Sequence, residues 1–379
     1  DSSKEAYVLG NITVTINDGT ITNVFGGNDK NGTPNGDIYV YINNGNITST
    51  YGGGNETSAK ETNVYLNGGS SNKIFGGSNI SGVVNTSNVE INAGISDSVY
   101  GGNNQGGTTG VTNVYVNGGD INFVYGGGEK TSVTENTNVT LNGEVNNVFG
   151  GSNLEGSVPN SYINVINGGA INIYGGNNQG GNTENSHIDI YGGYIENVYG
   201  GGLKAETGTT NVNLYYGRVD NLFGGGSEAG ATTTNVGLGN GTANKVFGGS
   251  NISGDVNDSY VRNITAPSKD NIVVDTSFTE STINNSSATN ISSSETINVK
   301  ITNNTGANIS KWKLYIFTSK GILDSNWSSA MVYASNGSFY ANHVNQWYGT
   351  NTLSSGSSYE FSFNIHSYVN FENFKIYWL

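Results

Sequence analysis

The chain has 379 residues, of which 58 are glycine and only three are proline, and it contains no cysteine. Its 29 acidic and 15 basic residues give a net charge of -14. This balance excludes a basic, phosphate-neutralising surface, so we expect neither nucleic acid nor an anionic membrane as a partner.

The same composition bears on location and anchoring. Without cysteine the chain forms neither disulfides nor thiolate metal sites, which fits a surface protein exposed to oxidants. No apolar run approaches the length of a membrane span, and the sequence starts at Asp1 without a signal peptide. We therefore expect a monomeric part of an extracellular or cell-surface protein that does not itself insert into a membrane.

A short phrase repeats along the first 265 residues: an aliphatic residue, an aromatic ring and two glycines. It first occurs as Val24-Phe25-Gly26-Gly27 and returns every 24 to 26 residues. Such a period is typical of a solenoid, because each unit buries its apolar face only by stacking on its neighbours. The repeated rings are Phe25, Tyr51, Phe75, Tyr100, Tyr125, Phe149, Tyr174, Tyr199, Phe223 and Phe247.

Two strands are predicted in each unit. The first is seen in Asn113-Val114-Tyr115-Val116-Asn117, where apolar residues alternate with others as in a half-buried strand. Its inward residues should be Val14/Ile16, Val40/Ile42, Val64/Leu66, Val89/Ile91, Val114/Val116, Val139/Leu141, Ile163/Val165, Ile188/Ile190, Val212/Leu214 and Val236/Leu238. The second strand carries the aliphatic residue before each ring: Val24, Ile74, Val99, Val124, Val148, Ile173, Val198, Leu222 and Val246, with Thr50 as the exception.

A unit of about 25 residues has the length of one coil of a parallel β-helix. The density of glycine and asparagine disfavours a helical solenoid, and the scarcity of leucine disfavours leucine-rich repeats. The sequence therefore predicts an all-β fold, with a right-handed parallel β-helix of about ten coils over residues 1–265.

The orientation of the rings has two possible answers. Since Val198 is the natural inward residue, Tyr199 should lie on the opposite face of its strand, so that the rings form an external stripe. Alternatively, the rings bend inwards at the turn and stack as a ladder in the core. An exposed stripe of this length would be a liability unless it binds a ligand or is covered. Alternation on the other strand also places rings outside, so the candidate carbohydrate contacts in this part are Tyr65, Tyr115, Tyr125 and Tyr199.

Asparagine-rich turns such as Asn103-Asn104-Gln105 are expected to form ladders in which side-chain amides satisfy one another. A structural calcium ion at Asp29, Asp37 or Asp97 is conceivable, but no EF-hand-like spacing of carboxylates supports it. We therefore expect no cofactor.

The repeat ends after Val261, and residues 266–295 have the polar composition of a cap or linker. All four tryptophans follow within the last 68 residues. Short alternating runs such as Lys313-Leu314-Tyr315-Ile316-Phe317, separated by turn signals, predict an antiparallel β-sandwich over residues 296–379.

Five motifs follow one another in this part. They are Val299-Lys300-Ile301-Thr302-Asn303-Asn304-Thr305-Gly306, Ile309-Ser310-Lys311-Trp312, Ser325-Asn326-Trp327-Ser328-Ser329, Asn345-Gln346-Trp347-Tyr348-Gly349 and Ser355-Gly356-Ser357-Ser358-Tyr359-Glu360-Phe361-Ser362-Phe363. Their order and approximate spacing resemble those of the family-two cellulose-binding modules, over roughly residues 295–379.

That resemblance implies a β-sandwich in which Trp312 is structural, whereas Trp327 and Trp347 lie on a flat face that stacks on crystalline cellulose. The family's first surface tryptophan and its terminal cysteine pair have no counterpart in this chain. The face would then have two rings, or be helped by Tyr340 or Tyr348. The alternative is that Trp327 and Trp347 pack onto the solenoid.

A glycine- and asparagine-rich β-helix followed by such a sandwich resembles the tāpirins, noncatalytic polysaccharide adhesins of cellulose-degrading thermophilic bacteria. This resemblance implies attachment of cells to plant biomass. The function expected is noncatalytic binding of insoluble plant polysaccharide through exposed aromatic residues. Cellulose is the first partner expected, and xylan and pectin stay open.

Two other functions stay open. Parallel β-helices often host pectin lyases and polygalacturonases, so an enzyme acting on pectin-like substrates is the main alternative. Such sites need an arginine base beside calcium carboxylates, or an acidic cluster for acid/base work. In this chain Arg218 occupies a repeat position and His187 stands alone, so we expect no catalysis. The third function is that of a passive spacer displaying the sandwich.

Overall fold

The computed structural model describes residues 8–267 continuously and, further along the chain, the backbone of the strands between 280 and 378. The chain divides into two compact units, Asp1–Lys269 and Asp270–Leu379. Among the described residues there is no helix, so the described fold is all-β.

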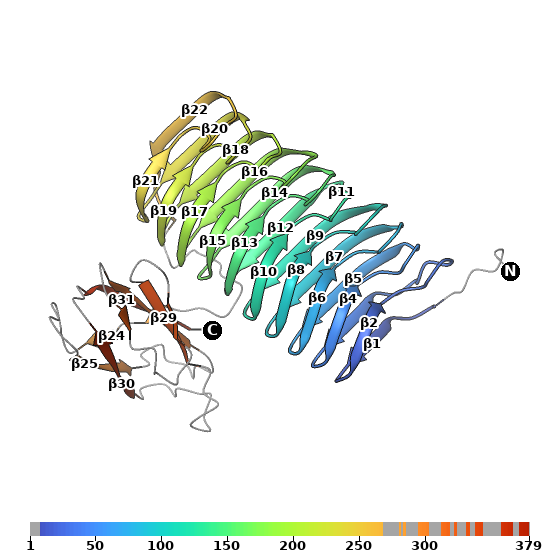
Figure 1. The fold of residues 1–379 in the computed structure, drawn as a ribbon, viewed down its shortest axis with the longest axis horizontal. Coiled ribbons are helices and arrows are strands. Elements are labelled where there is room, and N and C mark those ends of the chain that lie inside the picture. The colour runs from blue at the N-terminus through green and yellow to red at the C-terminus, as the bar shows by residue number, and fades with distance from the viewer. Residues whose placement is uncertain are drawn as a thin grey trace. The chain divides into compact units, whose positions relative to one another are not determined.

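The first unit is a parallel β-solenoid of about ten coils (Figure 1), with one strand of each coil in each of two sheets. Sheet A consists of β1 (Ile12–Ile16), β3 (Ile38–Ile42), β5 (Ala59–Leu66), β7 (Val83–Ile91), β9 (Thr108–Val116), β12 (Asn136–Leu141), β14 (Ser157–Val165), β16 (Asn182–Ile190), β18 (Thr207–Leu214), β20 (Ala231–Leu238) and β22 (Val256–Asn263), with the short β11 (Ser132–Val133) beside β9. Sheet B consists of β2 (Thr20–Phe25), β4 (Asn46–Tyr51), β6 (Ser70–Phe75), β8 (Ile95–Tyr100), β10 (Asp120–Tyr125), β13 (Glu144–Phe149), β15 (Gly169–Tyr174), β17 (Tyr194–Tyr199), β19 (Arg218–Phe223) and β21 (Thr242–Phe247).

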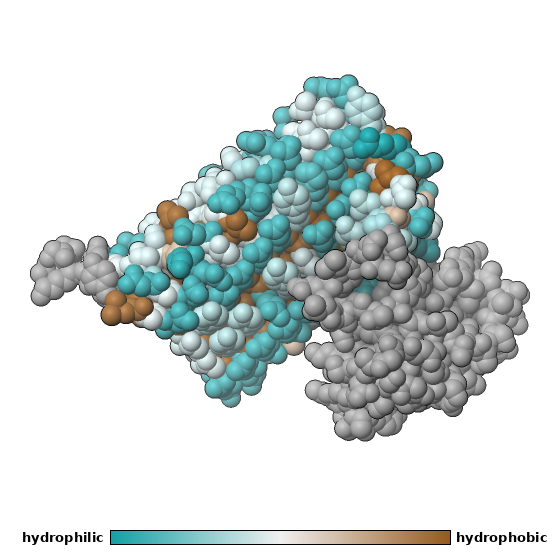
Figure 2. Space-filling view, turned by 180° about the vertical axis from the view of Figure 1, so that it is seen from behind, coloured by the Kyte–Doolittle hydropathy of each residue, from teal (hydrophilic) through white to brown (hydrophobic). Residues whose placement is uncertain are grey.

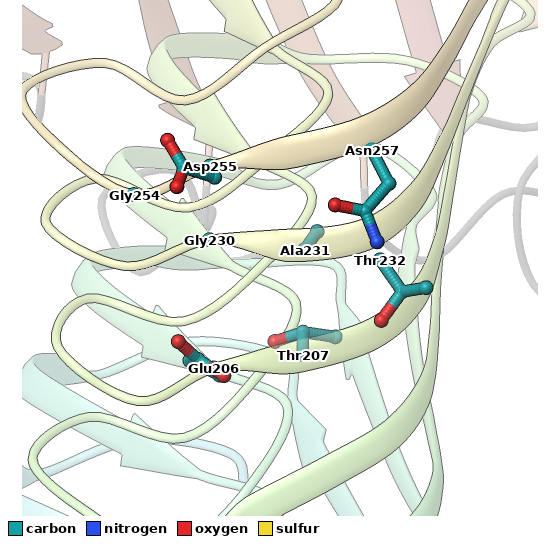
Figure 3. A pocket seen from close by; sticks show the side chains of 8 residues that line it. All are labelled: Glu206, Thr207, Gly230, Ala231, Thr232, Gly254, Asp255 and Asn257. Atoms are coloured by element: carbon teal, nitrogen blue, oxygen red, sulfur yellow. The ribbon is translucent and has the colours of Figure 1, made fainter.

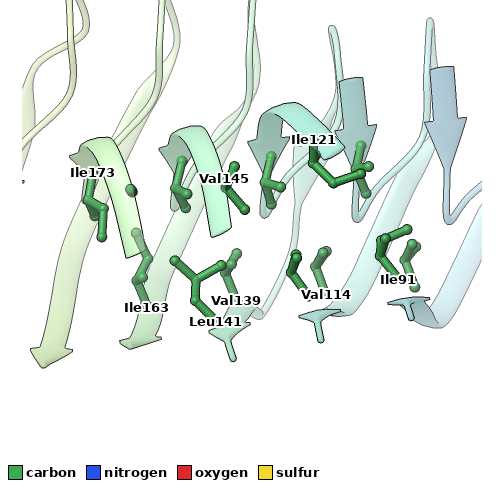
Figure 4. Packing of buried hydrophobic residues seen from close by; sticks show 14 of the residues in the cluster. Ile91, Val114, Ile121, Val139, Leu141, Val145, Ile163 and Ile173 are labelled. Atoms are coloured by element: carbon green, nitrogen blue, oxygen red, sulfur yellow. The ribbon is translucent and has the colours of Figure 1, made fainter. Parts of the chain in front are cut away.

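The aliphatic residues of the two sheets face each other and form one continuous core (Figure 4). Ile121 and Val145 of sheet B point towards Val139 of sheet A, and all three are at most 4% exposed. The predicted inward residues are confirmed, although Val14, Ile16, Leu238 and Val246, in the first and last coils, are only partly buried. The exceptional Thr50 is also buried, and its hydroxyl is satisfied by the Ser71 hydroxyl at 3.0 Å.

The glycine after each ring is required by the close approach of adjacent coils. A methyl group on Gly126 would lie 2.3 Å from the carbonyl oxygen of Gly150 and 2.9 Å from the Cβ of Thr137. The same carbonyl accepts a hydrogen bond from the Thr137 hydroxyl at 2.6 Å. The turn is therefore closed tightly, and no side chain fits between the coils at this position.

The repeated rings from Tyr51 to Phe223 are buried, so their interpretation as an exposed stripe is wrong; Phe25 is partly buried and only Phe247, in the last coil, is exposed, at 45%. From Phe25 to Phe247 they stack in one column, with neighbouring centroids 4.6 to 5.2 Å apart and planes within 12° of parallel. Tyr125 and Tyr199, expected as carbohydrate contacts, are 3% and 6% exposed. Both faces of each of these two rings are occupied by neighbouring rings, so neither is available to stack on a sugar.

The reason lies in the loop after each Gly-Gly turn, which covers the rings. They form a hydrophobic cluster separate from the aliphatic core, so they do not enter the space between the sheets. Amides from the loops reach the phenol oxygens: Asn153 Nδ2 donates to Tyr100 at 3.2 Å, and Asn178 Nδ2 donates to Tyr125 at 3.4 Å. Strand alternation says nothing about the path of a loop, which is why both orientations stayed open at the sequence level.

The strands of the second unit form two antiparallel sheets. One has the order β23 (Glu280–Ser281), β31 (Phe371–Trp378), β26 (Trp312–Thr318), β29 (Ser338–His343) and β28 (Met331–Tyr333). The other has the order β24 (Ile283–Asn285), β25 (Glu295–Thr302), β30 (Ser358–His366) and β27 (Ile322–Leu323). The short strands β23 and β24 fall within the segment expected to be a cap or linker.

Substitution of Gly126 tests the close packing of the coils. Gly126→Ala should lower the free energy of unfolding by roughly 1–3 kcal/mol, because the added methyl overlaps the next coil. Gly249→Ala is the matched control, since nothing lies within 4 Å of a methyl group there, and it should change stability by less than about 0.5 kcal/mol. Chemical denaturation of both variants checks this; equal effects would contradict it.

The buried ring column predicts a loss of stability at alkaline pH. Burial, reinforced by the nearby Tyr199 and Glu228, raises the pKa of Tyr174 to about 12, above its ordinary value of 10.0. As the pH rises, the unfolded chain therefore loses this proton before the folded chain does. The contribution of Tyr174 to the free energy of unfolding is fully present below pH 10 and is lost as the pH rises towards 12. Tyr174→Phe keeps the ring in the stack but has no proton to lose. It should reduce the alkaline decrease in the free energy of unfolding by on the order of 2 kcal/mol. Denaturation curves at pH 9.5 and 11.5 measure it, and an unchanged fall would argue against the burial.

Candidate functional site

The outer face of sheet A carries side chains in rows, because equivalent residues of successive coils pair in register. Two rows run along the centre of this face. The first row consists of Tyr39, Asn63, Asn88, Asn113, Asn138, Tyr162, His187, Asn211 and Asn235. The second row consists of Tyr41, Tyr65, Glu90, Tyr115, Thr140, Asn164, Asp189 and Asn213.

The tyrosines of the first coils stand on edge. The rings of Tyr41 and Tyr65 are stacked with centroids 4.8 Å apart and planes 10° from parallel, and Tyr39 lies parallel to Tyr41 at 6.5 Å. Since the stack runs from coil to coil, the rings turn edges and hydroxyl groups outwards, and only the ends of a stack leave a ring face accessible. This group therefore offers hydroxyl groups for hydrogen bonding, and few ring faces for stacking.

An amide ladder fills the middle of the first row. Asn88, Asn113 and Asn138 each donate from Nδ2 to the Oδ1 atom of the asparagine one coil earlier, at 2.9 to 3.0 Å. Tyr39 precedes this ladder and Tyr162 follows it. The ladder holds four amides rigidly, with equal spacing, between two aromatic rings.

Two carboxylates flank the ladder. Glu61 Oε1 accepts a hydrogen bond from Asn88 at 3.1 Å, and Glu90 Oε1 accepts one from Asn117 at 3.3 Å. Burial raises the pKa of Tyr65, and the neighbouring Tyr41 and Glu90 raise it further. The phenol of Tyr65 therefore keeps its proton at neutral pH and is a hydrogen-bond donor beside acceptor groups.

A second aromatic group lies further along the same face. Tyr162 stacks on His187 with centroids 5.0 Å apart, and Tyr191 stacks on Tyr215 at 5.2 Å. Asp189 Oδ2 lies 3.5 Å from the Tyr191 hydroxyl. Burial raises the pKa of Tyr191 to about 12, and the nearby Asp189 contributes to the rise.

The expected site residues fall into four groups. Tyr65 and Tyr115 lie half-buried on the outer face of sheet A, next to Glu90 in the second row. Tyr125 and Tyr199 lie in the buried ring column and not on this face. Three further residues, Trp327, Trp347 and Tyr348, lie outside the described residues. For Tyr340 only the backbone is described, in β29.

Sequence reasoning missed the asparagine row on this face. Its signal is the repeated dipeptide Asn-Val, in which the valine points into the core and the preceding asparagine must point outwards. The expected ladders were located in the turns instead, where they are also found: Asn104 donates to Asn79 and Asn79 donates to Asn55, both at 2.8 Å. The turn ladders are thus confirmed.

The aspartates considered as calcium ligands have other contacts. Asp29 accepts a hydrogen bond from Asn55 at 2.9 Å, and Asp97 accepts one from Asn122 at 3.1 Å. The backbone N–H of Asp37 donates to Asn11 at 3.0 Å. Within the described part of the chain, no three side chains of His, Cys, Asp or Glu gather as metal ligands would.

A polar hollow of about 350 Å³ opens at the start of β18, β20 and β22 (Figure 3). Glu206 and Asp255 lie on either side of Gly230, which leaves room between the two carboxylates, and Asn257 adds an amide. Thr207 also lines the hollow, but its side chain is only 2% exposed. Two carboxylates alone do not define a ligand site.

The described surface on one face of the molecule is mainly polar (Figure 2). On the face seen in Figure 2, hydrophobic residues appear in small separate groups among hydrophilic ones. Over residues 8–267 and the described strands, no helix has the length and apolarity needed to cross a membrane.

No protein-family model, curated protein or solved structure matches this chain. The chemistry of the site therefore has to be argued from its own residues.

His187 lies in the first row between Tyr162 and Asn211, and its protonation can be tested. Its Nε2 atom faces Asn211 Nδ2 at 3.2 Å, and burial lowers its pKa, although Asp189 opposes this. The unfolded chain therefore binds the proton first as pH falls, so this contribution to stability is complete above the ordinary pKa of 6.5 and is lost in acid.

His187→Asn should place an amide beside Asn211 and remove that contribution. We expect its melting temperature to fall less between pH 7.5 and pH 5.5 than that of the unchanged chain. Thermal unfolding at both pH values measures the difference. An identical fall in the two proteins would show that His187 is not held neutral by its surroundings.

Proposed function

We propose that this protein is a noncatalytic, extracellular binder of insoluble plant polysaccharide, cellulose first of all, that attaches cells to biomass. The observation that carries the proposal is the outer face of sheet A. On it, tyrosine hydroxyls, amides and carboxylates repeat in register over successive coils. A repetitive polymer meets the same groups at every coil, so many weak contacts add up.

The second unit supports the same function by resemblance. Its two antiparallel sheets agree with the β-sandwich that the likeness to cellulose-binding modules implies, and we propose that they pack in that way. In this arrangement Trp327 and Trp347, with Tyr340 or Tyr348, stack on the polysaccharide surface. The solenoid then contributes hydrogen bonds through Tyr65 and Tyr115, and the tryptophans contribute ring faces.

A pelleting assay tests the proposal. The full chain should sediment with microcrystalline cellulose, and Trp327→Ala with Trp347→Ala in the same chain should reduce the bound fraction severalfold. A Tyr65→Ala/Tyr115→Ala variant should cause a smaller loss, because the second row is only one part of the surface. Bovine serum albumin is the negative control for non-specific sedimentation.

The same incubation separates the alternatives. Reducing sugar or unsaturated product released from cellulose, xylan or pectin would replace the proposal with a lyase or hydrolase. Binding that is lost completely in the tryptophan variant, and unaffected by the tyrosine variant, would make the solenoid a spacer. Absence of sedimentation with every polysaccharide would contradict the proposed function altogether.

A further inference from the structure

The hydrogen-bond inventory of the first row shows which kind of group a ligand must bring. An asparagine amide has two donor hydrogens and two acceptor lone pairs. Asn88 Nδ2 donates to Asn63 Oδ1 and to Glu61, at 3.0 and 3.1 Å. Asn138 Nδ2 donates to Asn113 Oδ1 and to the Thr112 carbonyl, at 3.0 and 3.2 Å. Asn88 and Asn138 thus use both hydrogens, whereas Asn113 Nδ2 makes one donation, to Asn88 at 2.9 Å. Each acceptor Oδ1 in the ladder still has a second lone pair. The row therefore offers mainly acceptors, and hydroxyl groups are fitting donors.

The charge of this face selects among hydroxylated ligands. Glu61 and Glu90 border the ladder, and both raise the pKa of Tyr65, which reports a negative potential beside the row. The whole chain carries a net charge of -14. A sugar that carries a carboxylate would be repelled at this surface, particularly at low salt, whereas a neutral sugar would not. The face thus suits a neutral polysaccharide better than a pectin-like one.

The spacing between successive coils favours one orientation of a bound sugar chain relative to the solenoid axis. One coil advances by the 4.8 Å that separates the rings of Tyr41 and Tyr65. This is close to the length that one hexose adds to an extended β-1,4-linked chain. Side chains on the same face of one strand are about 6.6 Å apart, which does not match that length. A ligand chain along the solenoid axis therefore stays in register from coil to coil, while one along the strands does not.

From these three observations we propose that the first row, from Tyr39 to Tyr162, binds a neutral β-1,4-linked polysaccharide chain lying along the solenoid axis. Each coil contacts about one sugar unit, whose hydroxyls donate to the Oδ1 atoms of the half-buried Asn88, Asn113 and Asn138. Asn63 is only 6% exposed and serves as the acceptor for Asn88. The row covers six consecutive coils through Asn63, Asn88, Asn113 and Asn138. This inference rests on the proposed function and names its substrate class and orientation on the solenoid.

Calorimetric titration with β-1,4-gluco-oligosaccharides of two to eight units tests it. The protein is the full chain carrying Trp327→Ala and Trp347→Ala, so that the second unit contributes little. Affinity should increase with each added unit up to about six and then level off. Adding Asn113→Val should weaken binding of the six-unit ligand roughly fivefold to tenfold, the effect of one lost hydrogen bond.

Asn197→Val is the matched control. Asn197 occupies the middle of an equivalent ladder on sheet B, where it donates to Asn172 at 3.0 Å and accepts from Asn221 at 2.9 Å. It should leave binding within twofold of the starting protein while losing a similar amount of thermal stability. If Asn113→Val fails to fold, Asn113→Ser and Asn197→Ser make the same comparison.

The outcomes separate the two levels of the argument. Three results would each overturn the first row as the site. They are equal binding by the Asn113 and Asn197 variants, an affinity that stops increasing at two sugar units, and tighter binding of oligogalacturonides than of gluco-oligosaccharides. Sedimentation of the unchanged chain with cellulose, together with any of these results, would leave the proposed function standing. If neither soluble nor insoluble glucan binds, both proposals fall.

Discussion

Parallel pairing in register between equivalent strands is the interaction on which the rest of this solenoid depends. It places each residue directly over the residue of the same kind one coil earlier, as with Val114 over Val89 and Asn113 over Asn88. Each type of row packs in its own way. Aliphatic rows fill the core, the rings stack with centroids 4.6 to 5.2 Å apart, and the side-chain amides form hydrogen bonds with one another. Because every coil meets its neighbours along whole rows, a single bulky group at a glycine such as Gly126 disturbs two coils at once.

The period of the sequence was sufficient to predict the coils and the inward residues, because both follow from spacing alone. It was not sufficient to place the rings, since their burial depends on loops such as the one that brings Asn153 to Tyr100. The asparagine row on sheet A was predictable from the Asn-Val dipeptides, because the residue before an inward valine must point outwards. The charge environment of Tyr65 comes from Glu61 on its own strand and from Glu90, which pairs with it from the next coil; the burial that raises its pKa most could not be read from the spacing.

The geometry of the outer face also refines how aromatic residues would serve a polysaccharide binder. A ring that stacks on a sugar must offer its face, but Tyr41 and Tyr65 offer their faces to each other. Regular stacking along the solenoid therefore stabilises the protein and at the same time converts aromatic groups into rows of hydroxyls. A binder built on such a scaffold relies on repeated polar contacts, and ring faces have to come from elsewhere, as Trp327 and Trp347 would supply them.

Two of the amide ladders end on a carboxylate, which fixes their direction. An ionised aspartate only accepts hydrogen bonds, so Asn55 must turn its N–H towards Asp29, and Asn122 must do the same towards Asp97. In both ladders each amide donates to the residue one coil earlier in the chain. The first residue of the ladder is therefore only an acceptor, and this residue is the aspartate. The first row donates in the same direction, from Asn138 to Asn113 and on to Asn88. Between Asn138 and Asn63 the amide oxygens and hydrogens therefore alternate in one sense along the solenoid. A sugar chain, which also has two different ends, would meet the same order of groups over these coils.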